Sequence, residues 1–331
     1  MKAYQVSKYK RPMQVGEVAE PAIDDRDVLV DVHAAGVNLL DAKIRDGEFK
    51  LFLPYKAPFI LGHDLAGVVT RVGSAVTRFT VGDEVYARPR DGRIGTFAER
   101  IAVDEDDLAI KPANLSMAEA ASVPLVALTA WQALVERANL QPGQKVLVHA
   151  GSGGVGAYAI QLAKHLGATV TTTTGTSNLE WVRDLGADVV IDYRTQDFEE
   201  VAHDYDIVLD SQGGDTLAKS LRVLKPGGTA IGIAGPPDPD FARQQGLRLP
   251  LRLAMTALSH KTRRAARRHG VRYSFLFMRA SGTQLDEITK LIETNVLRPI
   301  LDQAYPFDEA PQALAHVEGG RTKGKVVITM V

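Results

Sequence analysis

The feature that most constrains this chain is a glycine-rich segment at residues 151–156, Gly-Ser-Gly-Gly-Val-Gly. It lies between an apolar run that predicts a buried strand, KVLVHA, and a segment that predicts a helix, AYAIQLAKHLG. A glycine loop in this context is typical of a dinucleotide site, because the first turn of the helix offers free N–H groups and the positive end of its dipole to a pyrophosphate. The glycines permit a tight turn, close approach of the cofactor and close packing of helix on strand. We therefore predict cofactor contacts from Ser152, Gly153, Gly154 and Val155.

The rest of the chain divides into two parts by its sequence pattern. After the glycine segment, strand-like runs alternate with helical segments of about ten residues, which predicts βαβ units and a parallel sheet. The runs are ATVTTTT, DVVIDY, DYDIVLDS and GGTAIGIAG. The first 125 residues instead contain short β-branched runs separated by glycines, a pattern that favours a partly closed barrel. At 331 residues the chain is long enough for two domains.

The second strand of the alternating region predicts which dinucleotide is bound. A site for NAD usually has an Asp or Glu about 20 residues after the first glycine, where it binds the ribose hydroxyls. Residues 171–176 contain no acid, so we expect NADPH, whose extra 2′-phosphate an uncharged strand end tolerates. Expected donors to that phosphate are Thr174, Thr176, Ser177 and Tyr193, with cationic help from Arg194 or, in the tail, Arg321 and Lys323. The alternative is that these hydroxyls only complete a turn.

The composition excludes several classes of function. The chain has no cysteine, which excludes disulfides, thiolate zinc sites and cysteine nucleophiles. With 39 Lys and Arg against 40 Asp and Glu, the formal charge is −1, which argues against a general binder of polyanions. The N-terminal residues contain no apolar segment typical of a signal peptide, and no apolar run approaches the roughly 18 residues of a membrane span. We therefore expect a cytoplasmic protein.

Segments along nearly the whole chain resemble the medium-chain dehydrogenase/reductase superfamily, and within it the zinc-free NADPH quinone oxidoreductase and enone reductase branch. In the family's order they are AAGVNLLDAKIRDG, ILGHDLAGVVTRVGSAVTRFTVGDEVYA, GTFAER, AASVPLVALTAWQAL, VLVHAGSGGVGAYAIQLAK, LGADVVIDY and GGRTKGKVVI. The resemblance implies an α/β fold in which a doubly wound parallel sheet, a Rossmann domain, is inserted into a GroES-like β-rich substrate domain. We expect the first GroES-like part at 1–125, the NADP-binding Rossmann domain at 126–280 and the return to the substrate domain at 281–331, with the active site in the cleft.

The zinc enzymes of this superfamily bind their catalytic metal through a cysteine, the histidine of a GHE motif and a further cysteine or acid. Here Asn38 stands at the position of the first cysteine, and His63, in GHD, is alone. The connection from Asp83 to Gly95 is also too short for the family's lobe with four cysteines. Because catalytic zinc needs about three protein ligands, we predict no metal and interpret His63 as structural.

The lack of a Lewis acid narrows the predicted chemistry to conjugated acceptors. Hydride transfer to a quinone or an enone places the charge on a delocalised phenolate or enolate oxygen, which hydrogen-bond donors can stabilise. The resemblance implies catalytic roles for Asn38, Lys43 and Tyr55, and cofactor contacts from Asp41, Thr129 and Gly235. A solvated surface position for Lys43, and a wall rather than a proton relay at Tyr55, remain alternatives. The proton donor stays open.

Residues 241–285 carry ten Lys or Arg and no Asp or Glu, so the rest of the chain has 29 basic against 40 acidic residues, or −11. A basic amphipathic helix in this segment, LPLRLAMTALSHKTRRAARRHG, can bind a membrane surface, an acidic partner or nucleic acid, cover the substrate pocket, or be a solvated helix. We favour the last two, because aromatic residues are not interleaved as in grooves for single-stranded nucleic acid. We expect neither a membrane nor nucleic acid as a partner.

The apolar run VRYSFLFMR predicts an edge strand, which would be exposed in a monomer. The family pairs this region across a two-fold axis, so we predict a homodimer. Taken together, the sequence predicts a zinc-independent, NADPH-dependent reductase of quinones or of the C=C bond of α,β-unsaturated carbonyls. The alternatives are an alcohol dehydrogenase or carbonyl reductase of the same superfamily, and a non-enzymatic protein that binds NADPH or RNA.

Overall fold

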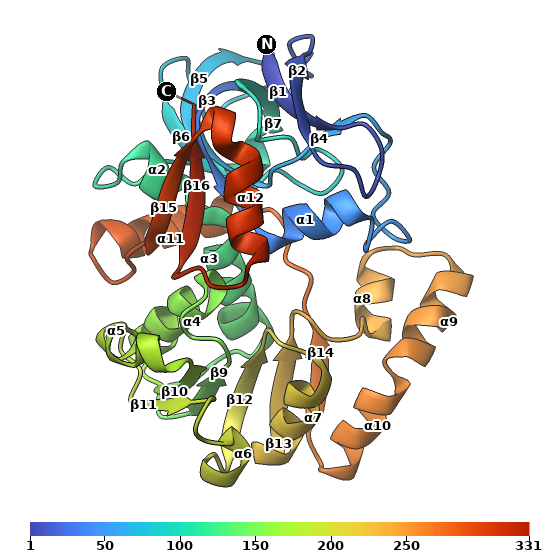
Figure 1. Cartoon of the computed structure of the whole chain (residues 1–331), viewed down its shortest axis with the longest axis vertical. Helices are drawn as coiled ribbons and strands as arrows, with labels where there is room; N and C mark the ends of the chain where they lie inside the picture. Colours follow the sequence, from blue (N-terminus) through green and yellow to red (C-terminus); the bar gives the residue numbers. More distant parts are fainter. Residues whose placement is uncertain (331) are drawn as a thin grey trace. The chain divides into compact units, whose positions relative to one another are not determined.

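The computed structural model describes residues 1–330, which fold into two compact units (Figure 1). Unit 1 comprises Met1–Leu128 and the segment that begins at Arg279, and unit 2 comprises Thr129–Met278. Unit 2 is therefore inserted into unit 1 along the sequence. The domain limits expected from the sequence, at residues 125 and 281, lie close to these divisions.

Unit 2 is built on a parallel sheet with the strand order β11-β10-β9-β12-β13-β14. The strands are β9 Lys145–Val148, β10 Thr169–Thr174, β11 Val189–Asp192, β12 Tyr205–Asp210, β13 Leu224–Gly232 and β14 Arg272–Phe275. In chain order this is 3-2-1-4-5-6, the doubly wound arrangement, so the predicted α/β class and parallel sheet are confirmed. The order reverses between β9 and β12, and a ligand crevice is expected beyond the carboxyl ends of these two strands.

Helices connect the strands of unit 2 and follow its last turns. They are α4 Gly154–His165, α5 Leu179–Asp184, α6 Phe198–Val201, α7 Gly214–Val223, α8 Pro239–Gln244, α9 Leu249–Leu258 and α10 His260–Arg268, with a 3-10 turn at Thr176–Asn178 and a π-helical turn at Gln132–Arg137. The basic segment thus forms two helices, α9 and α10, that meet at Ser259 rather than one helix. Figure 1 shows them following one another in the orange part of unit 2.

Unit 1 contains two sheets, one of order β15-β16-β3-β5-β6-β8, with β7 also paired to β3, and a smaller one of order β2-β1-β4. The strands are β1 Lys2–Val6, β2 Gln14–Glu17, β3 Asp27–Val37, β4 Phe59–Ile60, β5 Asp64–Val72, β6 Glu84–Ala87, β7 Arg100–Asp104, β8 Leu108–Ile110, β15 Leu301–Pro306 and β16 Lys325–Thr329. The pairing of β16 with β3 places Val326 opposite Val37. The C-terminal strand therefore lies beside the end of β3.

Two helices of unit 1, α2 and α3, begin at residues that are typical of helix N-termini. The helices of this unit are α1 Leu39–Asp46, α2 Met117–Ala121, α3 Pro124–Trp131, α11 Gly282–Glu293 and α12 Ala310–Glu318, with 3-10 turns at Glu105–Asp107 and Phe307–Glu309. Ser116 and Glu119 form a capping box at α2, and Pro124 starts α3 because proline fits the first turn of a helix but not its interior. Helix α3 continues past Leu128 into unit 2.

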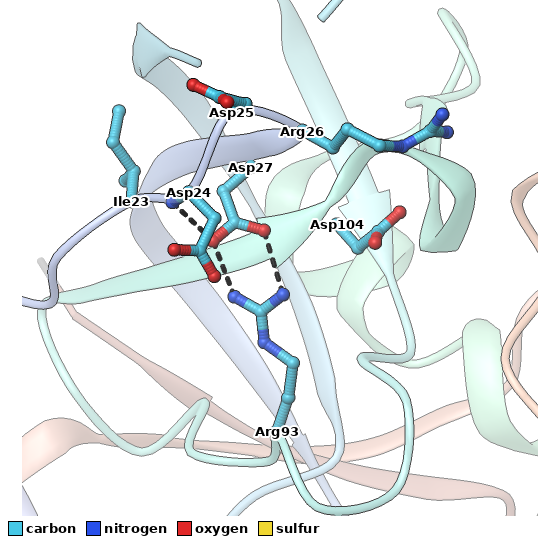
Figure 2. Close-up of a pocket in the computed structure, with 7 residues that line it drawn as sticks. All are labelled: Ile23, Asp24, Asp25, Arg26, Asp27, Arg93 and Asp104. Carbon is cyan, nitrogen blue, oxygen red and sulfur yellow. Dashed lines mark hydrogen bonds and ion pairs between the residues drawn. The ribbon is translucent and has the colours of Figure 1, made fainter. Parts of the chain in front are cut away.

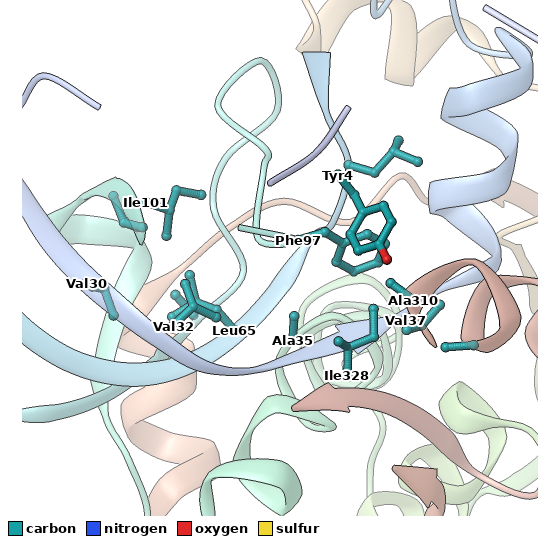
Figure 3. Packing of buried hydrophobic residues seen from close by; sticks show 14 of the residues in the cluster. Tyr4, Val30, Val32, Ala35, Val37, Leu65, Phe97, Ile101, Ala310 and Ile328 are labelled. Carbon is teal, nitrogen blue, oxygen red and sulfur yellow. The ribbon is translucent and has the colours of Figure 1, made fainter. Parts of the chain in front are cut away.

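The core of unit 1 is formed by apolar side chains from the long strands and from α12. Val30 and Val32 of β3, Leu65 of β5 and Ile328 of β16 are at most 3% exposed, and Figure 3 shows them in one cluster with Phe97. Burying each such side chain contributes roughly 1.5–3 kcal/mol. The middles of the strands are therefore committed to packing, and their ends carry the polar groups described below.

The edge of the unit 2 sheet differs from the sequence-based expectation. β14 ends at Phe275, and Phe275, Leu276 and Met278 are only 3%, 4% and 7% exposed. Phe241 of α8 packs edge-on against Phe275 with ring centroids 5.1 Å apart, and the Phe275 N–H donates to Asp238 Oδ2 at 2.9 Å. These apolar side chains are thus packed within unit 2, although β14 is the edge strand of the sheet, as predicted. The homodimer stays a prediction.

Candidate active site

The glycine loop of unit 2 is shaped by contacts that exclude side chains. A Cβ at Gly151 would lie 2.1 Å from Thr172 Oγ1, and a Cβ at Gly156 would lie 2.3 Å from the carbonyl oxygen of Ala150. Only glycine fits these two positions, where the loop packs against β10 and against its own turn. At Gly153 the nearest atom, Ala150 O, would be 3.4 Å away, so this side of the loop is open.

The open side of the loop faces the first turn of α4. Gly153 is the extended residue before α4, which begins at Gly154, and Ser152, Gly153, Gly154 and Val155 are all half-buried. The first N–H groups of a helix have no acceptor within it and favour an anion. The cradle that a Cβ would fill, together with these donors, fits the pyrophosphate of a dinucleotide, although the contacts themselves stay a prediction.

The end of β10 is overhung by two side chains from beyond β11. A Cβ at Gly175 would be 3.4 Å from Tyr193 Oη and 3.5 Å from Arg194 Nε, so both side chains lie over this glycine. Tyr193 is 60% exposed, which is high for a tyrosine. Arg194, which the sequence analysis names as a cation for this site, lies beside the Tyr193 hydroxyl here, and this combination suits a phosphate on the ribose.

Two of the predicted hydroxyl donors do not point outward. Thr174 is 1% exposed and its Oγ1 is buried without a hydrogen-bond partner, while the Thr176 hydroxyl donates to Asp192 Oδ2 at 2.6 Å. Neither hydroxyl proton is available to a phosphate in this structure, which corrects that expectation. Ser177 is exposed at the same turn and stays a predicted donor.

The other predicted cofactor residues occupy different environments. Thr129 is 4% exposed in α3, and Gly235 packs so closely on Tyr273 that a Cβ there would lie 2.4 Å from the tyrosine oxygen. Arg321 and Lys323 belong to unit 1, in the turn between α12 and β16, where Lys323 N donates to Asp302 Oδ2 at 3.2 Å. The cofactor roles of all four stay predictions.

The carboxyl ends of β9 and β12 lead into two buried titratable groups, His149 and Asp210. His149 lies 3.1 Å from Thr173 Oγ1 and 2.9 Å from Ser220 Oγ through its two ring nitrogens, and burial lowers its pKa to about 4. Asp210 Oδ1 accepts the Gly213 N–H at 2.6 Å, and burial raises the pKa of this carboxyl group. Its Oδ2 is buried without a partner. His149 is therefore neutral, and Asp210 secures the turn at Gly213.

Unit 1 contains a second polar region, the buried polar cluster, which we define as Asn38, Asp41, His63, Asp64 and Lys325. All five residues are at most 5% exposed. Asn38 links β3 to α1, His63 and Asp64 stand at the start of β5, and Lys325 starts β16. The cluster thus lies where three strands meet the first turn of α1.

Lys325 is the cation of the buried polar cluster. Its ammonium donates to Asn38 Oδ1 at 2.5 Å, to the Val37 carbonyl at 3.1 Å and to Asp64 Oδ2 at 3.1 Å. Three acceptors match the three N–H donors of an ammonium. The sequence analysis missed this residue, and the one available signal is a lysine at the start of the apolar run KVVITM.

Asn38 and Asp64 are also fully engaged. The Asn38 amide nitrogen donates to Asp64 Oδ2 at 2.9 Å and to the Gly36 carbonyl at 3.3 Å, and Asp64 Oδ1 accepts the Leu125 N–H at 2.7 Å. Both amide hydrogens of Asn38 are therefore used inside unit 1. Asn38 thereby positions the start of α1, and its predicted catalytic role stays a prediction.

Asp41 and His63 form the other half of the buried polar cluster. Asp41 Oδ1 lies 2.6 Å from His63 Nδ1, and Asp41 Oδ2 accepts the Asn38 N–H at 2.8 Å. His63 Nε2 is buried and has no hydrogen-bond partner among residues 1–330. The structure thus agrees with a structural role for His63. Direct contact between Asp41 and the cofactor stays a prediction, since both carboxylate oxygens already have partners.

The buried polar cluster does not fit a zinc ion. The Lys325 ammonium is bonded to Asn38 Oδ1 and Asp64 Oδ2, the oxygens that a metal would need, and a second cation beside it would be repelled. Within the described part of the chain, no group of three His, Asp or Glu side chains is arranged to hold a metal ion. Metal chemistry is therefore not assigned to this site.

Tyr55 and Lys43 are the remaining predicted catalytic residues. Tyr55 Oη accepts the Gly92 N–H at 3.3 Å, and burial raises the Tyr55 pKa to about 12, so the phenol is protonated near neutral pH. In residues 1–330 no acceptor takes its O–H, which leaves this donor free. The Lys43 side chain is 35% exposed on α1, with its ammonium 3.5 Å from Glu48. Their catalytic roles stay predictions.

Arg88 is a buried charge near Tyr55 that sequence reasoning missed. It directly follows β6, is fully buried, pairs with Asp91 and donates to the Pro89 carbonyl at 3.0 Å, while its Nε is buried without a partner. Arg88 lowers the pKa of Tyr55 and Asp91 raises it. The signal in the sequence was an arginine immediately after an apolar strand, in VYARPR.

A surface pocket of about 500 Å³ lies on unit 1, and its most buried acid, Asp27, is paired with a cation. Figure 2 shows the Arg93 guanidinium between the pocket's acids, bonded to both oxygens of Asp27 at 2.8 and 2.6 Å. Asp27 is 1% exposed and also accepts the Asp24 N–H at 2.9 Å. The bidentate pair holds the turn before β3 to the loop after β6, so we interpret this pocket as structural.

The doubly wound sheet, its glycine cradle and the second β-rich unit define an oxidoreductase of the dinucleotide-binding class. Family models match this chain as "Alcohol dehydrogenase GroES-like domain" at residues 24–113 and as "Zinc-binding dehydrogenase" at residues 185–328. The chain belongs to the medium-chain dehydrogenase/reductase superfamily, in its quinone and enone reductase branch, as the sequence analysis predicts.

Three proteins illustrate the relationship. The chain is 36% identical over 329 residues to "NAD(P)H oxidoreductase RTN4IP1, mitochondrial" of Mus musculus, covering 92% of this chain and 82% of that protein. It is 35% identical over 321 residues to "NADPH-dependent alkenal/one oxidoreductase, chloroplastic" of Arabidopsis thaliana, covering 94% and 74%. The solved quinone oxidoreductase from Coxiella burnetii superposes with a TM-score of 0.88 at 30% identity, covering 100% of this chain and 99% of that one.

Proposed function

We propose that this protein is an NADPH-dependent reductase of quinones or of the C=C bond of α,β-unsaturated carbonyl compounds. The names of the relatives support both acceptor classes and the cofactor, since one reduces alkenals and enones with NADPH and another is a quinone oxidoreductase. The observation that carries the proposal is the end of β10, which carries no acid of its own and is overhung by Arg194 and Tyr193. The carboxylate of Asp192 on the neighbouring strand β11 accepts the Thr176 hydroxyl and the backbone N–H of Arg194. The Arg194 guanidinium would attract a ribose phosphate.

The residues of unit 2 account for nucleotide binding. The first turn of α4 would hold the pyrophosphate through its N–H groups, and Gly153 leaves room for its approach. Arg194, Tyr193 and Ser177 would hold the 2′-phosphate. When bound, NADPH supplies a hydride. The chain's own contribution to that step is to hold the nucleotide in one orientation.

The residues of unit 1 account for the choice of acceptor. Because Lys325 occupies the polar cluster, no Lewis acid is assigned to polarise an isolated carbonyl group. The negative charge on an enolate or phenolate oxygen needs only hydrogen-bond donors. We propose that the free O–H of Tyr55 and the Lys43 ammonium supply them, and that solvent or Tyr55 protonates the product.

Steady-state kinetics with matched acceptors tests the proposal. NADPH oxidation is measured with a benzoquinone, with an α,β-unsaturated ketone and with the corresponding saturated ketone. We expect turnover of the first two and none of the third, with a lower KM for NADPH than for NADH. Turnover of the saturated ketone alone would favour the alcohol dehydrogenase alternative.

The Arg194→Ala variant tests the cofactor site separately from the acceptor. Loss of one charged hydrogen bond to a phosphate should raise the KM for NADPH by about tenfold or more and leave the KM for NADH unchanged. The matched control is Arg183→Ala, an exposed arginine on α5. An equal effect on both cofactors would contradict the assignment of Arg194 to the 2′-phosphate.

The assembly of the protein and its location in the cell are proposed separately from its reaction. We propose a homodimer from the family relationship alone, and light scattering at micromolar concentration tests it. In residues 1–330 no helix is long and apolar enough to cross a membrane. A cytoplasmic location stays a prediction, because relatives carry mitochondrial and chloroplastic names.

A further inference from the structure

Helix α10 exposes four cations that have no partner. Lys261, Arg264, Arg267 and Arg268 are exposed, and in residues 1–330 none of their side chains makes a hydrogen bond or ion pair. Several other surface arginines are paired, for example Arg100 with Asp31 at 2.6 Å. Others, such as Arg11 and Arg183, are exposed and unpaired in residues 1–330, so α10 is distinguished by four unpaired cations on a single helix.

Two acids at α6, beside the helix α7 that packs on α10, are already committed to cations of α7. α10 packs on α7, and α7 packs on α6. Arg222 of α7 pairs with Glu199 of α6, with a bond of 2.8 Å, and Lys219 of α7 pairs with Asp197 beside α6. Since residues 241–285 contain no acid either, the charge of α10 is not neutralised within unit 2.

Helix α9 places exposed leucines next to this charge. Leu249, Leu253 and Leu258 are 67%, 61% and 60% exposed, and Leu249 and Leu253 are one helical turn apart. We define the α9–α10 face as these three leucines together with Lys261, Arg264, Arg267 and Arg268. Apolar side chains this open are unfavourable in water and signal an interaction surface when they gather in one place.

The buried residues of the two helices show which of their sides face outward. Met255, Ser259 and Ala266 are each at most 2% exposed and lie four and seven residues apart, which is one stripe along a helix. Ser259 N donates to Met255 O at 3.1 Å at the end of α9, and Arg263 N donates to Ser259 O at 2.9 Å at the start of α10. The buried residues face the rest of unit 2, so Leu249 and Leu253 on α9 and the four cations on α10 lie on the outward sides of their helices, whereas Leu258 lies beside the buried stripe.

We propose that the α9–α10 face docks the protein on an anionic lipid bilayer. A surface helix with cations beside exposed leucines matches an interfacial helix, whose apolar side chains enter the headgroup boundary while Lys and Arg attract acidic lipids. Helices α9 and α10 have 10 and 9 residues, so each is roughly 15 Å long and can lie flat on a surface. A nucleic acid would not require the leucines, and the face has no aromatic side chain to stack on bases.

The proposal departs from the sequence-based expectation of no membrane partner. The sequence analysis considered a membrane surface for this basic segment and favoured a cover of the substrate pocket or a solvated helix. The exposure of the leucines is a property of the fold, and alternation of apolar and basic residues in the sequence does not reveal it. The docking proposal is independent of the acceptor class and of the proposed function.

Vesicle flotation at physiological ionic strength tests the docking surface. The full-length protein is mixed with phosphatidylcholine vesicles, or with equimolar phosphatidylcholine and phosphatidylglycerol. We expect binding to the anionic vesicles only, weakened by high salt. Arg264→Glu with Arg267→Glu should lower the partition coefficient at least about tenfold. Leu249→Ser with Leu253→Ser should lower it severalfold at every salt concentration.

The matched control reverses two exposed cations of unit 1, Lys8→Glu with Arg11→Glu, and should bind as the unchanged protein does. Circular dichroism and thermal unfolding show that each variant folds, whatever its reductase activity. Failure of the unchanged protein to bind anionic vesicles, or full binding by the doubly reversed α10 variant, would overturn the proposal. Salt-sensitive binding of single-stranded RNA or of an acidic protein, without vesicle binding, would overturn it in favour of that partner.

Discussion

The buried polar cluster of unit 1 and the α9–α10 face of unit 2 place positive charge in opposite environments, one buried and hydrogen-bonded and the other exposed. Lys325 is 4% exposed and every N–H of its ammonium has an acceptor, whereas the α10 cations are exposed and have none. Burial forces pairing, because an unpaired ion in the interior costs several kcal/mol. An exposed charge carries no such requirement. The comparison indicates that the buried charge of Lys325 stabilises the fold, whereas the exposed charges of α10 are available to bind a partner.

Removing the buried cation should have the largest effect on stability. Lys325→Met leaves the Asp64 carboxylate buried with the Asn38 amide and the Leu125 N–H but no cation, so the free energy of unfolding should fall by about 3–5 kcal/mol. Chemical denaturation measures the change, with Lys323→Met, an exposed neighbour, as the control. A fall in the free energy of unfolding of less than about 1 kcal/mol would contradict the comparison, because it would show that the fold does not depend on the buried ion pair.

Low pH should destabilise unit 2, because His149 is buried in its neutral form and its ring nitrogens contact hydroxyl groups rather than a carboxylate. The His149 pKa is about 4 in the fold against 6.5 in the unfolded chain, so its contribution is complete above pH 6.5 and is lost as the pH falls toward 4. The loss should reach about 3 kcal/mol. Denaturation at several pH values measures it, and His149→Gln should flatten the profile over this range. An unchanged slope in that variant would contradict the assignment.

The contribution of Asp210 to the pH dependence of stability should be smaller than that of His149 and opposite in sign. Burial raises its pKa, so its ionisation weakens the fold as the pH rises above 3.8. Asp210→Asn keeps an oxygen for the Gly213 N–H and removes the charge, so stability at neutral pH should rise by about 1 kcal/mol at most. Thermal unfolding of the two proteins at pH 5 and pH 8 measures this. A large loss would mean that the charge itself holds the turn.

The smallest expected effect is on the α9–α10 face. Arg264→Glu with Arg267→Glu should change the free energy of unfolding by no more than about 0.5 kcal/mol, since neither side chain has a partner to lose. Denaturation under the conditions used for Lys325→Met makes the two numbers comparable. A loss of several kcal/mol would show that these cations support the fold and would remove the contrast between the two regions.

The parts of the fold that depend on local sequence could be predicted, and those that depend on long-range pairing could not. The glycine loop and the strand–helix alternation around residues 145–235 carry their own signals, and the parallel sheet follows from them. Lys325 meets Asn38 across 287 positions, through the β16–β3 pairing, which no local pattern encodes. Similarly, composition gave hydroxyls at the end of β10, but only the structure shows that the Thr176 hydroxyl is bonded to Asp192.

The edge strand β14 shows the same difference between what local sequence predicts and what long-range contacts decide. Its apolar run was read correctly as a strand as far as Phe275, but its exposure depended on what packs beside it. Phe241 and Asp238, more than thirty positions earlier in the chain, contact the ring and the N–H of Phe275. The segment that separates them from Phe275 contains the helices of the α9–α10 face.

The central claim is that hydride reaches the conjugated carbon of an acceptor and not its carbonyl carbon. The most direct measurement uses NADPH deuterated at the transferred position, with an α,β-unsaturated ketone as acceptor and mass spectrometry and NMR of the product. We predict a saturated ketone with deuterium on the β-carbon and an intact carbonyl group. Deuterium on a carbinol carbon, in an allylic alcohol, would contradict the account, because the hydride would then have reached the carbonyl carbon.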